Sequence, residues 1–427
     1  MKILIKNGRV INPAADLDEI KDVLIIDGVI KKIDEEIIDE ADNIIDANNL
    51  WVTPGFIDLH VHFREPGFEH KETIETGSKS AAKGGFTTVC CMPNTKPTID
   101  SKEIVEFVKN RAEEKAIVNV LVVGSITKGL QGEELSDMEG MAEAGICAIS
   151  DDGRTVQNSN LKRRGMEKAK SLNIPVFVHC EDEELLRSGV MNSGKISKQL
   201  GLPGILPEVE NVIIARDIIL AGGTGSNLHI CHISTGTGVD LLKFGKNIGV
   251  KVTGEVCPHH FTLSDKEVLS LNTDFKMNPP LRREEDIRAI KRGLKEGIID
   301  AIATDHAPHH EDEKNVGFIE APFGIVGLET ALPIAITELV EEGWLTPMEL
   351  IEKLTINPAK VLGIDKGDMS VGKAADITII DPFVEYKIDV GSFVSKSKNS
   401  PFHNRSVKGR VEYTIVNGKI VYNRSDS

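Results

Sequence analysis

The sequence predicts an α/β fold, a (β/α)8 TIM barrel joined to a small β-sandwich domain built from both chain ends. Eight short apolar runs follow one another through the middle of the chain. Amphipathic helical stretches separate many of these runs, and β-rich segments occupy both ends. Buried parallel strands are near-continuously apolar, and eight of them over about 310 residues fit a barrel with insertions.

The predicted barrel strands are residues 56–63, 87–94, 119–126, 146–152, 175–181, 227–234, 251–258 and 300–306. The predicted helices among them are residues 101–116, 161–172, 207–222, 237–247 and 284–297. Two further helices, 326–343 and 347–354, are expected to pack after the last strand. Strands that alternate with helices indicate a parallel sheet covered on both faces. We therefore place the barrel domain at residues 54–365.

Both chain ends carry short alternating or apolar runs that are typical of antiparallel strands. The runs are residues 2–9, 23–33 and 43–46 at the start, and 376–381, 407–416 and 417–422 at the end. Asn-Gly and Asp-Gly pairs among them are typical of tight turns. Neither end makes a domain by itself, so residues 1–53 and 366–427 are predicted to combine into one β-sandwich.

The composition is that of an ordinary globular chain of 427 residues, 40% hydrophobic and 27% charged. A net charge of −16 argues against nucleic acid or an acidic membrane as the main partner. No stretch approaches the roughly 20 apolar residues of a membrane span, and the first residues lack the pattern of a signal peptide. We therefore expect a cytoplasmic protein. The six cysteines lie in apolar runs without C-x-x-C spacing and are expected to be buried thiols.

Residue types that bind metals stand at the ends of five predicted strands, where barrels place their functional side chains. They are His60 and His62, Asp152, His179, His232, and Asp305. His60 and His62 share one face of a strand, since residues i and i+2 point the same way. A single histidine there would be read as a core residue, but six such residues at equivalent strand ends predict a metal site.

Four imidazoles and two carboxylates exceed the needs of one tetrahedral zinc ion, which keeps about three protein ligands and an open position. Two ions fit better, one held by His60, His62 and Asp305 and the other by His179 and His232, with a carboxylate spanning both. Asp151 and Asp152 both follow the fourth strand, and strand geometry lets only one of them bridge. The sequence pattern leaves that choice open.

Five motifs give the chain a specific resemblance to a known family. Residues 58–66 (DLHVHFREP) and 303–309 (ATDHAPH), the latter followed by Lys314, are similar to the two signatures of the class I, bacterial- and archaeal-type dihydroorotases. Residues 91–95 (CMPNT), 150–153 (SDDG) and 278–282 (NPPLR) also match that family. The resemblance spans the whole chain, including both ends.

The resemblance implies a role for each matching residue. Metal ligands fall on His60, His62, Asp152, His179, His232 and Asp305, with Asp152 as the bridge between two Zn²⁺ ions per subunit. Substrate contacts fall on His62, Arg64, Asn94, Asn278 and His309, with backbone contacts at Phe323 and Gly324. The implied reaction is the reversible cyclisation of N-carbamoyl-L-aspartate to (S)-dihydroorotate in de novo pyrimidine (UMP) biosynthesis. A hydroxide bridging the zinc ions would attack the ring amide, while Asp305 carries its proton to the ring nitrogen.

Two residues near the first signature carry further expectations. Arg64 suits a carboxylate because its planar fork of donors binds one bidentately, and its place two residues after His62 puts it on the same inward face. Asp58 shares the inward side of His60 and is either an acceptor that orients a ligand or a plain strand-end acid. His259 and His260 match no ligand position, so we expect buried or supporting roles. A loop that closes over the substrate is expected within residues 307–324.

Two other interpretations compete with this one. Hydantoinases and allantoinases share the barrel but bridge their metals with a carboxylated lysine, and this chain has no lysine between Lys128 and Lys162. A non-catalytic scaffold for aspartate transcarbamoylase would lack metal ligands, whereas all six positions are filled here. The resemblance leaves room for an active homodimer that also binds that transcarbamoylase.

Overall fold

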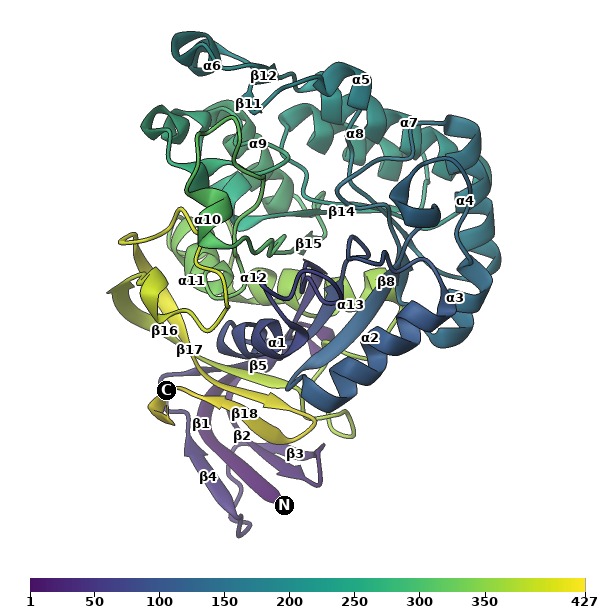
Figure 1. Ribbon diagram of the computed structural model, residues 1–427. Helices are drawn as coiled ribbons and strands as arrows, with labels where there is room; N and C mark the ends of the chain where they lie inside the picture. The colour runs from purple at the N-terminus through teal and green to yellow at the C-terminus, as the bar shows by residue number, and fades with distance from the viewer. Residues whose placement is uncertain (427) are drawn as a thin grey trace.

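A computed structural model describes residues 1–426 and contains the predicted barrel (Figure 1). Its eight parallel strands are β6 (Phe56–Val61), β7 (Phe86–Cys91), β8 (Asn119–Gly124), β9 (Ala148–Ile149), β10 (Val176–Val178), β13 (Leu228–Ile230), β14 (Val252–Val256) and β15 (Ala301–Ile302), paired in chain order. A parallel bridge from Val61 to His306 joins the last strand to the first. The His62 N–H donates to the His306 carbonyl at 2.9 Å, which closes the barrel.

Helices surround the strands much as predicted. Those that pack around the barrel are α1 (Ile74–Lys83), α2 (Lys102–Lys115), α3 (Met138–Ala144), α4 (Ser159–Ser171), α7 (Glu208–Thr224), α8 (Gly236–Asn247), α9 (Glu284–Lys295), α11 (Ala331–Ala335), α12 (Pro347–Leu354) and α13 (Ile356–Leu362). Helix α9 shows why these segments are helical. Ile287, Ile290 and Leu294 form its buried stripe, and acidic residues in its first turn and basic residues in its last turn complement the helix dipole.

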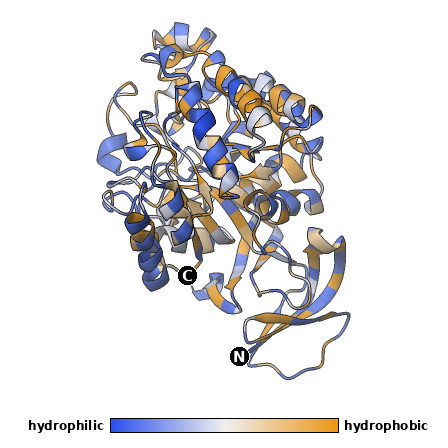
Figure 2. Cartoon of the chain, turned by 90° about the vertical axis from the view of Figure 1, so that its right-hand side faces the viewer, coloured by the Kyte–Doolittle hydropathy of each residue, from blue (hydrophilic) through white to orange (hydrophobic). Residues whose placement is uncertain are grey.

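Hydropathy follows this arrangement (Figure 2). The barrel strands at the centre carry mainly hydrophobic residues, while the surrounding helices carry both kinds. The predicted helix 326–343 begins only at Ala331 and continues as a π-helical turn through Ile336–Val340. All six cysteines are free; five are buried as expected, and Cys147 is half-buried. Within residues 1–426, no helix is long and apolar enough to cross a membrane.

The two chain ends combine into one eight-stranded mixed sheet. Its strands are β1 (Lys2–Asn12), β2 (Leu17–Ile26), β3 (Val29–Asp34), β4 (Asn43–Asp46), β5 (Trp51–Pro54), β16 (Ile377–Lys387), β17 (Ser406–Val416) and β18 (Lys419–Asn423). The antiparallel pairing of β5 with β16 connects the N-terminal and C-terminal halves. A separate buried cluster, including Ile3, Val52 and Ile377, fills this part of the molecule.

One predicted turn is wrong. Asn7 and Gly8 lie inside β1 as a bulge, where Asn7 has a φ of 61° and the register with β2 shifts between Ile5 and Gly8. A side chain at Gly8 would lie 2.4 Å from Val52, so the glycine permits close packing within the sheet instead of a reversal. The turns at Asp27–Gly28 and Asn417–Gly418 are present as predicted, between β2 and β3 and between β17 and β18.

Residues 183–205 form an insertion that the sequence did not indicate. Helix α5 (Glu183–Leu186), the two-stranded sheet of β11 (Met191–Asn192) and β12 (Gly204–Ile205), and helix α6 (Lys195–Leu200) make it up. It projects beyond the barrel, at the top of Figure 1. Its residues follow β10, so the insertion stands on the side of the barrel where the strands end.

Candidate metal centre

The structure brings together all six predicted metal ligands at one end of the barrel. His60 lies on β6 and His62 just after it; Asp152, His179, His232 and Asp305 each follow the end of a later strand. Their exposed fractions are 8% or less. Strands of a parallel barrel end on the same face, so residues far apart in the sequence meet there.

Two groups of side chains converge on neighbouring points. The Nε2 atoms of His60 and His62 lie 3.6 and 3.1 Å from Oδ1 of Asp305. Nδ1 of His179 lies 3.0 Å from Nε2 of His232. These are the spacings of donor atoms that share an ion, since ligands about 2 Å from a metal lie roughly 3–4 Å apart.

Asp152 lies between the two groups. Its Oδ1 is 3.2 Å from His60 Nε2, 3.7 Å from His232 Nε2 and 3.8 Å from His179 Nδ1. Its Oδ2 is 3.4 Å from His62 Nε2. A carboxylate that reaches all four imidazoles is placed to bridge two cations.

Asp151 points the other way. Its Oδ1 accepts the N–H groups of Ile126 at 2.7 Å and Thr127 at 3.0 Å, and its Oδ2 accepts the Thr127 hydroxyl. These bonds fix the loop that follows β8, and they leave Asp152 as the acid that faces the histidines.

The cluster is electrostatically suited to cations. Burial opposes ionisation of Asp152 and Asp305, but the neighbouring His60 and other imidazoles outweigh it and hold the pKa of both carboxyls below the ordinary value. Burial lowers the pKa of His62. His60 Nε2 and Asp152 Oδ1 are buried without a hydrogen-bond partner. Buried polar atoms are normally satisfied, so these unpaired donors fit divalent metal ions.

Two residues orient the imidazoles from behind. Glu255 Oε1 lies 3.0 Å from Nδ1 of His60, and its Oε2 lies 3.1 Å from Nε2 of His229. The imidazoles of His229 and His60 help to lower the pKa of Glu255 to about 2 against the opposing effect of burial. Asn94 Oδ1 accepts from Nδ1 of His62 at 2.8 Å. Such acceptors fix the tautomer that leaves Nε2 free for a metal.

Glu255 was missed in the sequence. The available signal was an acidic residue inside the otherwise uncharged run VTGEV of β14, which a buried strand does not contain without a partner. Glu181 was missed as well. It is 7% exposed, it accepts a hydrogen bond from the Asn278 amide, and its Oε2 lies 3.7 Å from His179 Nε2.

Asp58 orients backbone N–H groups, and it does not orient the imidazole ring of a metal-binding histidine. Its Oδ1 accepts the N–H groups of His60 and Thr304, both at 3.1 Å, and its Oδ2 accepts the Thr304 hydroxyl at 2.6 Å. It thereby links β6 to the end of β15. Burial raises its pKa to about 7.

A cavity of about 360 Å³ opens beside the cluster. Besides five of the metal-binding candidates, it is lined by Arg64, Asn94, Gly153, Asn278, Ala307, His309, Pro322, Phe323 and Gly324. All the residues expected to contact substrate therefore border one space. The remaining pair of interest, His259 and His260, is buried outside this lining, and His260 Nε2 donates to the Pro279 carbonyl at 3.0 Å.

The expected reason for the position of Arg64 is wrong, although its location is right. Strand β6 ends at Val61, and Arg64 lies in the following loop with a φ of 62°. Its Nε donates to the Pro308 carbonyl at 3.1 Å. Burial lowers its pKa to about 10, which leaves the guanidinium charged at neutral pH. The loop, not strand alternation, turns this cation toward the cavity.

His309 is neutral in this environment. Burial and the nearby Arg64 and Lys71 cations lower its pKa to about 2. Its Nε2 donates to the Phe323 carbonyl at 2.8 Å, and its Nδ1 lies 3.5 Å from the Lys71 ammonium. The side chain therefore stands between a cation and the backbone of the predicted closing loop.

A closed barrel with a His-x-His pair at the end of its first strand, further histidines after the fifth and sixth, and an aspartate after the eighth defines a metal-dependent amidohydrolase. The model of the family described as "Dihydro-orotase-like" matches residues 50–237. The dihydroorotase of Ruminiclostridium cellulolyticum is 50% identical over 418 residues, 98% of each chain. That of Geobacter sp. (strain M21) is 51% identical over 423 residues, 99% of each chain. The chain belongs to the dihydroorotase family.

Solved structures of similar fold include hydantoinases. The L-hydantoinase (dihydropyrimidinase) of Arthrobacter aurescens is 27% identical, with a TM-score of 0.89 over 99% of this chain and 96% of that one. The D-hydantoinase of Bacillus sp. AR9 is 25% identical, with a TM-score of 0.87 over 99% and 95%. The likeness covers the barrel and the composite sheet together.

Proposed function

We propose that the protein catalyses the reversible cyclisation of N-carbamoyl-L-aspartate to (S)-dihydroorotate, with two zinc ions in its barrel. The observation that carries this proposal is the convergence of four histidines and two aspartates beside a cavity lined by Arg64. A cluster of metal-binding side chains suits the hydrolysis and formation of an amide. The Arg64 guanidinium suits a substrate that bears a carboxylate. Identity of about half over the full length to dihydroorotases supports the same substrate.

The donor set suggests how the ions would be held. His60, His62 and Asp305 would bind one ion, His179 and His232 the other, and Asp152 both. Nitrogen and carboxylate donors in this number suit zinc. When bound, the ions would lower the pKa of a water molecule to about 7 and polarise the reacting carbonyl.

Asp305 is the proton carrier in this proposal. Its Oδ1 faces His60 and His62, which leaves Oδ2 to hold the proton. In ring opening it would take the proton of the attacking water and pass it to the leaving ring nitrogen. In ring closure it would take the proton from the ureido nitrogen as that nitrogen bonds to the side-chain carboxyl carbon, and pass it to the carboxyl oxygen, which departs as hydroxide when its bond to carbon breaks. The neighbouring imidazoles hold its pKa below the ordinary value, so Asp305 is ionised before each transfer.

The carboxylate that does not react would lie against Arg64, Asn94 and His309. The guanidinium of Arg64 would supply the positive charge that attracts this carboxylate. Since Asn94 Oδ1 is occupied by His62, its amide N–H groups are directed to other acceptors. Asn278 and the backbone at Phe323 and Gly324 would hold the rest of the ring. In this proposal, the carboxylate end of the substrate would lie against the loops that carry Arg64, Asn94 and His309. The reacting amide would lie over the metal ions.

Hydantoin hydrolysis is the second candidate, because the hydantoinases share the whole fold. The resemblance implies a carboxylated lysine as the bridge in hydantoinases, whereas the proposed bridge here is Asp152, which lies 3.2 Å from His60 and 3.7 Å from His232. Initial rates with dihydroorotate, hydantoin and allantoin at equal concentration test the choice. The proposal expects turnover of dihydroorotate far above the other two, and preferred hydrolysis of hydantoin or allantoin would refute it.

We also propose that the active protein is a homodimer that can associate with aspartate transcarbamoylase. The six filled donor positions support an enzyme and argue against a purely structural partner. Sedimentation of the protein alone and mixed with the transcarbamoylase of the same source tests both points. A monomer, or two components that sediment independently, would contradict them.

A further inference from the structure

A buried asparagine from the C-terminal part of the chain holds the loop that follows β15. Asn399 is 5% exposed. Its Oδ1 accepts the N–H of His309 at 3.1 Å, and its Nδ2 donates to the carbonyls of Ala307 at 3.1 Å and Gly324 at 3.0 Å. Its own carbonyl accepts the N–H of Val326 at 2.9 Å. One residue from outside the barrel thus joins both ends of this loop.

These contacts determine the orientation of the Asn399 amide. Two of the three partners are carbonyl oxygens, which need the NH2 group, and the third is an N–H, which needs the oxygen. A carboxylate at this position would set a negative oxygen against two carbonyls. The interaction is therefore specific to an amide.

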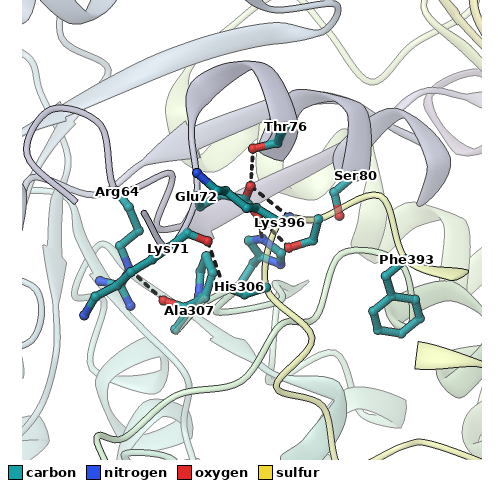
Figure 3. A network of polar contacts seen from close by, with 12 residues as sticks. Arg64, Lys71, Glu72, Thr76, Ser80, His306, Ala307, Phe393 and Lys396 are labelled. Carbon is teal, nitrogen blue, oxygen red and sulfur yellow. Dashed lines mark hydrogen bonds and ion pairs between the residues drawn. The ribbon is translucent and has the colours of Figure 1, made fainter. Parts of the chain in front are cut away.

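The segment that carries Asn399 is anchored to the loop after β6 as well. Ser397 Oγ donates to the Lys71 carbonyl at 2.7 Å. Glu72 joins this segment to the chain after β15: its Oε2 lies 3.3 Å from Nε2 of His306 (Figure 3). The same carboxylate oxygen accepts a hydrogen bond from Ser395 Oγ at 2.5 Å. The segment 395–399 therefore contacts the loops on both sides of the barrel closure.

Lys314 reinforces the same loop from within. Its ammonium, 6% exposed, donates to the carbonyls of Pro322 and Gly324, each at 3.1 Å, and to that of Lys276 at 3.4 Å. A buried cation is costly unless polar groups surround it. The Gly324 carbonyl is thus shared between Lys314 and Asn399.

The residues held in this way, Ala307, His309 and Gly324, form part of the cavity wall. His309 donates from Nε2 to the Phe323 carbonyl at 2.8 Å. Gly324 has a φ of +128°, and a side chain there would lie 2.8 Å from Cβ of Ala307 and 3.1 Å from Nε2 of His309. There is little room for this wall to shift without displacing His309.

We infer that Asn399 is a positioning residue for substrate binding, supplied to the active site by the C-terminal segment. Through His309 N and the Ala307 and Gly324 carbonyls it fixes the part of the cavity that receives the non-reacting carboxylate. This inference rests on the proposed function. It concerns binding of the carboxylate, because Asn399 touches neither the metal candidates nor the proton carrier.

Steady-state kinetics of Asn399→Ser and Asn399→Asp with dihydroorotate test the inference. Ser397→Ala is the matched control, since Ser397 is a buried residue of the same segment that bonds the other loop. We expect KM to rise about 10-fold in Asn399→Ser and further in Asn399→Asp, with zinc content unchanged and kcat within about 3-fold. Ser397→Ala should keep the wild-type KM.

A structural role alone would give a different result. If both Asn399 variants lower the melting temperature but keep the KM of the wild type, or if Ser397→Ala raises KM equally, the inference is wrong. Failure of the proposed function is seen separately, since wild-type protein would then not turn over dihydroorotate. In that case the KM values of the Asn399 variants are compared for whichever substrate the wild type turns over. They still report whether the cavity wall held by Asn399 positions that substrate.

Discussion

Nδ1 of His179 and Nε2 of His232 lie 3.0 Å apart at the mouth of the barrel, inside a buried cluster with two carboxylates. In neutral imidazoles at that distance, the two nitrogens either share a proton or direct both lone pairs at a cation. The second arrangement explains why Asp152 is close to both rings. The following predictions depend on it.

Asp152 and Asp151 form a natural pair for mutagenesis. We expect Asp152→Asn to lower bound zinc by about one ion per chain, because an amide bridges two cations poorly. Asp151→Asn should keep the zinc and instead lower the melting temperature, since it weakens the bonds to Ile126 and Thr127. Elemental analysis of both variants after gel filtration measures this. Equal zinc in the two variants would rule out Asp152 as the bridge.

Asp305→Asn should lower kcat for dihydroorotate by roughly 10³-fold, because it removes the proton carrier. Its far-ultraviolet circular dichroism should match the wild type, since Asp305 lies beyond the short strand β15. Turnover is measured in both directions. Activity within 10-fold of the wild type would show that another group moves the proton.

Glu255→Gln should weaken zinc binding roughly 10- to 100-fold, the usual effect of losing the partner of a metal-bound histidine. The carboxylate orients His60 through Nδ1, and an amide does so less strongly. Titration with a competing chelator measures the affinity. An unchanged affinity would mean that Glu255 serves only the packing of His229.

Arg64→Lys should raise KM for dihydroorotate roughly 10- to 100-fold, because lysine cannot form the bidentate pair with a carboxylate. Arg163→Lys is the control, since Arg163 is half exposed on α4 and pairs with Glu167 on the same helix. Steady-state kinetics at a fixed zinc concentration measure KM for dihydroorotate in both variants. If Arg64→Lys and Arg163→Lys give the same KM, the carboxylate is bound elsewhere.

Lys314 should make stability depend on pH in alkaline solution. Burial lowers its pKa from 10.5 to about 8, so between these values the unfolded chain binds the proton and the folded chain does not. Stability from this group therefore rises with pH across that window, by up to roughly 3 kcal/mol. Urea unfolding of wild type and Lys314→Met at pH 7.5 and 10 measures it. An equal change in both proteins would contradict the prediction.

The sequence predicted the metal cluster because each donor stands at the end of an apolar run, where barrel topology gathers side chains. It could not choose between Asp151 and Asp152, since that depends on how two adjacent peptide units turn after the short strand β9. The prediction that strand alternation puts Arg64 on the inward face of His62 also failed, because β6 ends three residues before Arg64. Strand alternation holds only while the chain remains extended.

Residues that act through others were the hardest to predict. Glu255 is 195 positions from His60, and Asn399 is 90 from His309. Their roles arise from contacts between distant segments, and a lone acid or amide in a sequence does not reveal its partner. Likewise, Asn7–Gly8 has the letters of a turn, but the parallel strands β4 and β5 beside β1 keep that chain extended.

The central claim is that six side chains at one end of the barrel hold the divalent cations that dihydroorotate turnover requires. Zinc content measured alongside that turnover, through chelator stripping and re-addition of zinc, tests it most directly. We predict about two zinc ions per chain, loss of turnover as they are removed, and recovery when zinc returns. Full turnover of dihydroorotate by protein stripped of all metal would contradict the account.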